Sequence, residues 1–362
     1  MLKLIHGADL HLDSPFSGLS PQKAAQRRAE LRQLPERLAR LAVEVGADLV
    51  LLSGDLFDSD RVYRETAQAL CTALGRLPCP VFIAPGNHDF YGPASPYATL
   101  SWPDNVHIFS TNTLEDVEIS GLNCTVWGRA FTEPHQSSSP LAGFSAPQDG
   151  RLHLMCLHGE VTQGDSDYGP ISREDIAASG LAYLALGHIH AHSGFRTEGR
   201  TVWAYPGCPE GRGFDELGEK GVIYAELENG CLTAGEFIPL CRRRYADLTV
   251  DITQKDPREA ILAAVPADSG EDIFRITLRG QGEVPDLSAL EEGLRPRFYG
   301  LTLRDRTTVP TDLWVRKEED SLTGLFLRKL WELNEQAPDH PILQQAVRFG
   351  LAALEHGEDP YL

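Results

Sequence analysis

The sequence predicts an α/β protein built in several layers, an α+β arrangement of four layers, followed by a smaller module. Apolar strand-like segments and helical segments alternate over the first ninety residues, which is typical of a layered α/β domain. Near Pro239 the pattern changes, and a second, shorter alternation of strands and helices begins. From Asp320 to His356 apolar residues recur every three or four positions, which predicts helix.

The first ninety residues contain five predicted elements. Residues 49–52, Leu-Val-Leu-Leu, are continuously apolar, as the central strands of a parallel sheet are. Leucines at intervals of three and four mark the buried face of the helix before them. We expect Pro35 to bend or break this helix, because proline lacks the amide hydrogen that a helix interior needs. The elements are a strand at 2–6, a helix at 21–46, a strand at 48–53, a helix at 61–77 and a strand at 81–84.

The middle of the chain is predicted to be mostly β-structure. Short strands are expected between residues 106 and 127, and the serine-, proline- and glutamine-rich stretch 132–150 is expected to form an exposed loop. Two apolar runs then each lead into a turn that contains histidine. The strands predicted here lie at 152–157, 181–186, 194–196, 201–204 and 221–227.

The pattern divides the chain into three parts. Residues 1–240 form the first domain, residues 241–313 a small α/β module, and residues 314–362 a helical segment. The module is predicted to contain a strand at 248–252, a helix at 257–264, a strand at 273–278, a helix at 287–294 and a strand at 298–303.

Composition and charge exclude several classes of protein. The 362 residues contain no run of about 20 apolar residues, so no membrane-spanning helix is predicted. Seven cysteines without a Cys-x-x-Cys pair argue against a disulfide framework and against a thiolate zinc site. Because Met1 leads directly into a strand rather than into a signal peptide, we expect a cytoplasmic protein. The net charge of −19 disfavours an extended anionic partner, although bound divalent cations would make one pocket locally positive.

Five predicted strands end in turns whose side chains can bind metals. The ends of neighbouring strands in such a sheet face the crevice where ligands bind, so we expect these side chains to lie close together. One of these histidines alone would more often be a structural residue, but packing would not select the whole set. The set is Asp9 with His11, Asp55 with Asp58, Asn87 with His88 and Asp89, His158, and His188 with His190.

This set of side chains predicts a centre with two divalent metals. Such metals lie about 3.5–4 Å apart and need oxygen and imidazole ligands with one bridging carboxylate. The predicted ligands are Asp9, His11 and His190 on one metal, Asn87, His158 and His188 on the other, and Asp55 between the two. Without a cysteine ligand, manganese is the expected metal, with iron or zinc as alternatives. The expected nucleophile is a hydroxide that bridges the metals and whose pKa both cations lower.

His88 is predicted to take part in catalysis rather than in metal binding. Its neighbour Asn87 is directed at the metals, so His88 points elsewhere and can protonate the leaving oxygen or stabilise the phosphoryl group. We expect Asp58, three residues after Asp55, to accept a hydrogen bond from the His88 ring and to raise its pKa. Asp89 is the second candidate for this role.

Two basic sites are candidates for binding a substrate phosphate. Arg212 follows the last predicted ligand strand and presents a planar fork of donors. A salt bridge to Glu216 or Asp215 is the alternative for this side chain. Three arginines at 242–244 could bind a phosphate backbone through counterion release, but such a run is more often a solvated strand end.

The order of the polar motifs resembles that of the calcineurin-like metallophosphoesterase superfamily. The motifs are Asp9-x-His11, Gly54-Asp55-x-x-Asp58, Gly86-Asn87-His88-Asp89, His158 and Gly187-His188-x-His190. Residues 8–15 and the stretch 205–221 further resemble the bacterial DNA repair exonucleases of the SbcD/YhaO type. The resemblance implies a β-sandwich flanked by helices, with a C-terminal capping module beside the active site. It also implies manganese-dependent nuclease activity on DNA and a coiled-coil, SMC-like ATPase partner of the SbcC/YhaN type, with a homodimer as a further possible assembly.

Three functions are compatible with these observations. The leading hypothesis is a metal-dependent phosphodiester hydrolase that acts as a DNA exonuclease or endonuclease subunit in repair. The second is a phosphodiesterase or phosphatase for small molecules such as cyclic nucleotides, which would use the same chemistry. The third is a scaffold that binds DNA or a partner and has only weak nuclease activity, and the complete ligand set argues against it.

Overall fold

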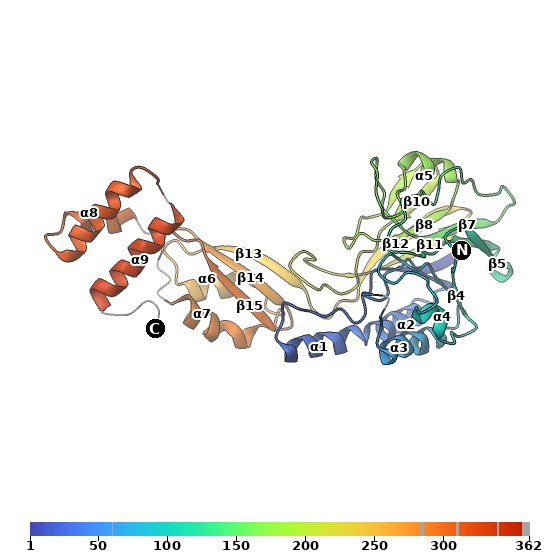
Figure 1. Ribbon diagram of the computed structural model, residues 1–362, viewed down its shortest axis with the longest axis horizontal. Helices are drawn as coiled ribbons and strands as arrows, with labels where there is room; N and C mark the ends of the chain where they lie inside the picture. Colours follow the sequence, from blue (N-terminus) through green and yellow to red (C-terminus); the bar gives the residue numbers. More distant parts are fainter. Residues whose placement is uncertain (60, 283–285, 309–310, 339, 357–362) are drawn as a thin grey trace. The chain divides into compact units, whose positions relative to one another are not determined.

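The computed structural model describes residues 1–59, 61–282, 286–308, 311–338 and 340–356. The chain divides into two compact units, Met1–Arg244 and Tyr245–Leu362, and many of their elements are labelled in Figure 1. The first unit thus ends four residues after the boundary expected at residue 240. The parts expected at 241–313 and 314–362 fall mostly within the second unit, and residues 357–362 of the expected helical segment lie outside the described residues.

The first sheet of unit 1 is six-stranded, in the order β12-β11-β1-β2-β3-β4. From β1 to β4 neighbouring strands are parallel, whereas β11 pairs with β1, and β12 with β11, in the antiparallel sense. The strands are β1 (Leu2–Gly7), β2 (Leu49–Leu52), β3 (Val81–Ile83), β4 (Val106–Ile108), β11 (Gly221–Glu228) and β12 (Cys231–Pro239).

The second sheet is also six-stranded, in the order β5-β6-β7-β8-β10-β9, with parallel central strands and an antiparallel strand at each edge. Its strands are β5 (Glu115–Ile119), β6 (Cys124–Gly128), β7 (Leu152–His158), β8 (Tyr183–Gly187), β9 (Arg196–Glu198) and β10 (Thr201–Ala204). The sheets pack face to face, because Leu4 and Leu51 of the first sheet share a buried apolar core with Val126 and Leu154 of the second.

Helices cover the outer faces of this sandwich (Figure 1). Three helices, α1 (Pro21–Leu31), α2 (Leu34–Glu44) and α3 (Arg64–Gly75), share a buried apolar core with the first sheet, and this core includes Leu38, Leu74 and Val50. On the second sheet, Ile176 of α5 (Arg173–Ser179) belongs to a core with Met155 and Leu184. The shorter elements are α4 (Pro96–Thr99) and the 3-10 helix η1 (Ser120–Leu122). The predicted four-layer α/β fold with a β-sandwich is therefore confirmed.

Two local features of unit 1 bear on the expectation. The helix expected over 21–46 is broken near Pro35, as predicted. It forms two helices separated at Arg32 and Gln33, and Pro35 lies in the first turn of α2, where its missing amide hydrogen costs nothing. Strand β12 was not predicted. It is an edge strand with mostly exposed or half-buried residues, and its sequence therefore has no clear alternation of apolar and polar side chains.

Unit 2 contains a small parallel sheet with helices packed against it. Its strands have the order β13-β14-β15 and are β13 (Tyr245–Asp251), β14 (Ile273–Arg279) and β15 (Gly300–Asp305). Ile261 of α6 (Pro257–Ala264) and Leu294 of α7 (Leu287–Leu294) are buried against Ile276 and Leu278. The 3-10 helix η2 (Arg295–Arg297) follows α7.

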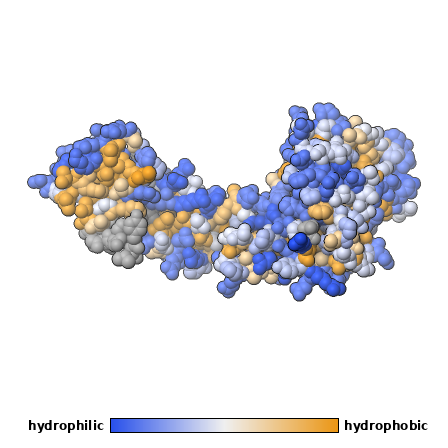
Figure 2. Space-filling model, viewed as in Figure 1, coloured by the Kyte–Doolittle hydropathy of each residue, from blue (hydrophilic) through white to orange (hydrophobic). Residues whose placement is uncertain are grey.

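The end of unit 2 is helical, as predicted, and contains two α-helices. The elements are the 3-10 helix η3 (Thr311–Glu318), α8 (Leu322–Asn334) and α9 (Pro341–His356), and they share a separate core that contains Trp314, Leu327 and Val347. Leu322 and Ile342 are exposed on these helices, and Figure 2 shows apolar surface gathered there. Among the described helices, none is both long enough and apolar enough to cross a membrane.

Candidate metal centre

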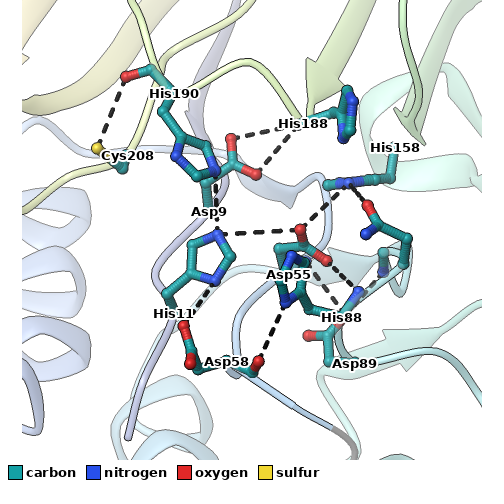
Figure 3. Close-up of polar contacts among 12 residues, drawn as sticks. Asp9, His11, Asp55, Asp58, His88, Asp89, His158, His188, His190 and Cys208 are labelled. Carbon is teal, nitrogen blue, oxygen red and sulfur yellow. Dashed lines mark hydrogen bonds and ion pairs between the residues drawn. The ribbon is translucent and has the colours of Figure 1, made fainter. Parts of the chain in front are cut away.

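The predicted polar turns follow the ends of five parallel strands, three in the first sheet (β1, β2, β3) and two in the second (β7, β8). Backbone hydrogen bonds join these turns. The amide of Asp9 donates to the carbonyl of Gly54 (2.9 Å), and the amide of Gly159 donates to the carbonyl of Gly187 (3.1 Å). The amide of His188 after β8 donates to the Asp9 carboxylate after β1 (3.1 Å), so the two sheets present their polar turns at one common edge, where Figure 3 shows the side chains facing one another.

The backbone at this edge adopts conformations that most residues avoid. Asp9, His11, Asp55 and His188 have positive φ angles of 54°, 42°, 50° and 109°, a region that residues with a Cβ atom rarely occupy and that concentrates at functional sites. The position of Gly54 at this edge also requires glycine, because a Cβ atom there would lie only 2.6 Å from Nδ1 of His158. The turns are shaped to aim these side chains, at a cost to local stability.

One cluster of potential metal ligands consists of Asp9, His11 and His190, whose ligand atoms lie within 4.8 Å of one another. The Nε2 atoms of His11 and His190 are only 3.1 Å apart. The backbones of Asp9 and His11 follow β1, and His190 follows β8, so both sheets contribute. This cluster contains the three residues predicted to hold the first metal.

A second cluster consists of Asp9, Asp55 and His158. Asn87 joins it through its side-chain oxygen, which lies 2.9 Å from Nε2 of His158. Asp55 Oδ2 lies 3.4 Å from His158 Nε2 and 3.9 Å from His11 Nε2, so this carboxylate stands between the two groups, and its role as a bridging ligand stays a prediction. Unlike the prediction, Asp9 takes part in both clusters.

The hydrogen bonds around the imidazoles test whether cations fit here. Nδ1 of His158 lies 2.9 Å from the carbonyl oxygen of Ser53 and must donate to it, which leaves a lone pair on Nε2, the atom that faces the oxygens of Asn87 and Asp55. In the same way, Nδ1 of His190 donates to Glu216, and its Nε2 lone pair faces His11. Lone pairs and carboxylate oxygens that face each other repel unless cations lie between them, so the residues fit a pair of divalent metals.

The electrostatics of the buried groups agree with this conclusion. Burial lowers the pKa of His11, His158 and His188 to about 4, so these imidazoles are neutral and able to bind a metal at physiological pH. Burial, and after it the neighbouring charge of Asp55, raises the pKa of Asp9 well above its usual range. Cations at this position would remove the repulsion between the carboxylates.

His188 lies beside the second cluster but, among the described residues, belongs to neither group of converging ligand atoms. Its ring makes an edge contact with His158, with 5.3 Å between the ring centroids, and stacks on Tyr168 at 4.9 Å. Its backbone amide donates to the Asp9 carboxylate (3.1 Å). Its assignment as a metal ligand therefore stays a prediction.

His88 lies at the rim of the centre, and its environment differs from the expectation in one respect. The ring is exposed, and Nδ1 is 3.1 Å from the backbone carbonyl oxygen of Asp58, not from its carboxylate. The Asp58 carboxylate instead contacts Nδ1 of His11 (3.2 Å) and the guanidinium of Arg212 (2.9 Å). Asp58 thus orients His88 through its main chain, because its side chain is already engaged elsewhere.

Asp89 does not orient His88 either. Its buried carboxylate accepts hydrogen bonds from the backbone amides of Leu56 (2.7 Å) and Gly86 (2.8 Å) and from the hydroxyl of Tyr97. Burial, and then the charge of Asp55, raises the pKa of Asp89. Asp89 therefore ties the turn after β2 to the turn after β3, which is a structural task.

Arg212 makes the salt bridge that was the alternative to a substrate contact. Its guanidinium lies 2.8 Å from Glu216 and 2.9 Å from Asp58. Glu216 in turn lies 2.7 Å from Nδ1 of His190. Burial opposes ionisation of Glu216 and Asp58, but the close contact of each carboxylate with a histidine and the charge of Arg212 outweigh it and hold both pKa values below their usual range. The contact of Glu216 with a predicted ligand was missed, and its only signal in the sequence was its position four residues after Arg212.

Residues 2–192 match the family model described as calcineurin-like phosphoesterase. The chain belongs to this family, and the predicted resemblance is confirmed. The family and the candidate ligands define a metal-dependent phosphoester hydrolase with a dinuclear centre.

The chain is similar to several individual proteins. The chain is 31% identical to the metallophosphoesterase YhaO of Bacillus subtilis (strain 168) over 308 residues, which cover 82% of this chain and 73% of that protein. It is 27% identical over 337 residues to the DNA double-strand break repair protein Mre11 of Saccharolobus solfataricus, covering 86% of this chain and 84% of that protein. For Mre11 of Aeropyrum pernix the identity is 25% over 283 residues, covering 70% of this chain and 64% of that protein.

Proposed function

We propose that this chain is the nuclease subunit of a DNA repair machine and cleaves phosphodiester bonds of DNA as an exonuclease or endonuclease with manganese. The observation that supports phosphodiester hydrolysis is a pair of ligand clusters that have Asp9 in common and lie beside the exposed ring of His88. DNA as the substrate is supported by the similarity to two Mre11 proteins that are named for double-strand break repair. The free cysteines of the described chain, five of them buried, support a reducing compartment such as the cytoplasm.

The residues of the centre divide into ligands and a proton donor. When bound, two divalent cations supply positive charge for the phosphoryl oxygens and lower the pKa of a water molecule. One cation would be held by Asp9, His11 and His190, and the other by Asn87, His158 and His188, with Asp55 contributing to both. His88 is fixed at Nδ1 by the Asp58 carbonyl, so its Nε2 can carry a proton towards the leaving oxygen of a substrate at the exposed rim.

The second unit, Tyr245–Leu362, contains no predicted catalytic group, and we assign it to placement of DNA and to partner binding. The partner we propose is an SMC-like ATPase with a coiled coil, and a second copy of this chain is a further partner. The exposed apolar side chains of α8 and α9, among them Leu322 and Ile342, support a role in assembly.

One observation favours a small phosphodiester as the substrate instead. The net charge of −19 repels a long polyanion at a distance, whereas a small diester has to reach only the centre itself. The catalytic groups would act in the same way on both substrates.

The test is a comparison of two substrates in the same metal titration. The purified chain is stripped with a chelator and then titrated with Mn²⁺ or Mg²⁺, with linear duplex DNA and a small aryl phosphodiester as substrates. We expect no activity without metal, and higher activity in Mn²⁺, because imidazole-rich sites favour manganese over magnesium. Full activity in excess chelator would contradict the two-metal centre. Rapid turnover of the diester without any DNA cleavage, alone or with the ATPase, would favour the small-molecule enzyme.

A further inference from the structure

We propose that the segment Cys208–Lys220, here called the strap, is a positioning device for one of the two metal sites. Through Glu216 and Arg212 it sets the orientation of both imidazoles in the cluster of Asp9, His11 and His190. Arg212 is thus a positioning residue rather than a ligand for the substrate phosphate. This inference rests on the proposed function, because it assumes that the cluster binds a cation.

The strap holds His190 at several points. Glu216 is buried, and its Oε1 atom lies 2.7 Å from Nδ1 of His190. The carbonyl oxygen of His190 accepts hydrogen bonds from the amide of Cys208 (3.3 Å) and from Nζ of Lys220 (3.1 Å). The nitrogen that faces His11 is then free to bind a cation. A carboxylate on the far nitrogen of a histidine ligand fixes its tautomer and increases its basicity.

A second carboxylate lies behind His11. Oδ1 of Asp58 is 3.2 Å from Nδ1 of His11, within ion-pair distance although not in the geometry of a hydrogen bond, and the ring is almost fully buried. Nε2 of His11 therefore points towards Nε2 of His190, at 3.1 Å. Each imidazole of this cluster has a carboxylate behind it, although the two carboxylates lie far apart in the sequence.

Arg212 connects the two carboxylates. Its Nη1 donates to Oδ1 of Asp58 (2.9 Å), and its Nη2 donates to Oε1 of Glu216 (2.8 Å). These are the same two oxygens that contact the imidazoles. The amide of Arg212 also donates to the other oxygen of Glu216 (2.7 Å). One guanidinium therefore fixes the distance between the groups that orient His11 and His190.

The other cluster is built differently. Behind His158 lies the backbone carbonyl of Ser53, at 2.9 Å from Nδ1, and not a carboxylate. A side-chain substitution in the strap cannot change that contact. The strap should therefore control one of the two metal sites and leave the other unaffected, and a general loss of structure would not show this selectivity.

The test measures Mn²⁺ binding to the full-length chain by isothermal titration calorimetry, with electron paramagnetic resonance to count bound ions. The variant is Glu216→Gln, which keeps the size of the side chain and removes its charge. Glu219→Gln is the matched control, because Glu219 is an exposed glutamate of the same strap. For Glu216→Gln we expect one Mn²⁺ site to weaken by about 10- to 100-fold, the range for losing such a partner, and the other to stay unchanged. Glu219→Gln should leave both sites as in the parent chain.

The outcomes separate this inference from the proposed function. If the parent chain binds no Mn²⁺, the proposed function fails. If the parent binds two ions and Glu216→Gln binds them with the parent's affinities, or loses both equally while folded, the strap is not a positioning device. If Glu216→Gln does not fold, the Asp58→Asn variant decides in its place. The Asp58 side chain is partly exposed, so its substitution should be tolerated by the fold, and it should weaken Mn²⁺ binding at the same single site. Partial recovery by Arg212→Lys relative to Arg212→Met would further support a charge that joins the two carboxylates, and equal affinities for these two variants would contradict it.

Discussion

Replacement of His88 by glutamine should separate catalysis from metal binding. The backbone amide of His88 donates to Oδ1 of Asp55 (2.9 Å), and this bond does not depend on the side chain. The ring itself is exposed and contacts the Asp58 carbonyl. We therefore expect His88→Gln to keep both metals and to change the free energy of unfolding by no more than about 0.5 kcal/mol, as is usual for surface substitutions. Asp55→Asn should lose metal, because it removes the charge that stands between the clusters.

The expected loss in rate follows from the role of a proton donor. Loss of a general acid lowers kcat by about 10²- to 10⁴-fold, which corresponds to about 2.7 to 5.4 kcal/mol of transition-state stabilisation at 1.36 kcal/mol per tenfold change. The loss should depend on the leaving group. A nitrophenolate departs without a proton, so a nitrophenyl diester should lose much less rate than DNA, whose leaving alkoxide needs protonation.

The assay compares kcat for His88→Gln and the parent chain on DNA and on aryl diesters of decreasing leaving-group pKa, with metal content measured by elemental analysis. A reduced metal content in His88→Gln would refute its placement outside the ligand set. An equal loss in kcat for every leaving group would refute its role as the acid and favour stabilisation of the phosphoryl group instead.

Three further predictions concern stability. Burial lowers the pKa of His6 to about 3, so the unfolded chain binds one more proton than the folded chain between pH 6.5 and 3. The free energy of unfolding therefore falls as the pH falls, by up to about 1.4 kcal/mol per pH unit. In urea denaturation without metal from pH 7 to 5, the free energy of unfolding of His6→Gln should fall less steeply with pH than that of the parent, and an equal pH dependence would contradict this. Asp89→Asn should lower the free energy of unfolding by about 3 kcal/mol, because the amide cannot accept all the hydrogen bonds of the carboxylate. A variant as stable as the parent would show that the turns after β2 and β3 do not depend on the Asp89 carboxylate. A chain of residues 1–244 should fold, bind two metals and cleave a small diester but not DNA, and DNA cleavage at the parent's rate would exclude a DNA-placing role for unit 2. A chain of residues 1–240 should be less stable than the chain 1–244 by about 3–5 kcal/mol, because it lacks Arg243, which pairs with buried Glu30. Equal stability of the two truncated chains would contradict a stabilising role for this ion pair.

The ends of strands were the most predictable part of this molecule. Asp9, Asp55 and His158 could be placed together because each follows an apolar run, and the sheet brings such ends to one edge. The partners behind them could not be placed in the same way. Arg212 and Asp58 are separated by 154 positions in the sequence, and the local periodicity of apolar residues cannot predict a contact over such a separation. Which oxygen of Asp58 faces His88 likewise depends on side-chain packing that the pattern of apolar residues does not contain.

The left-handed backbone and crowded carboxylates described for the centre also bear on how long this protein persists in a cell. Conformations such as those of Asp9 and His11 cost about 1–3 kcal/mol each, and the repulsion between buried Asp9 and Asp55 adds to that cost when no cation is present. Cations bind only the folded chain, so they shift the folding equilibrium by mass action. Metal scarcity would therefore increase the unfolded fraction and expose the chain to proteases. The abundance of the protein, and not only its activity, should follow the supply of divalent metal.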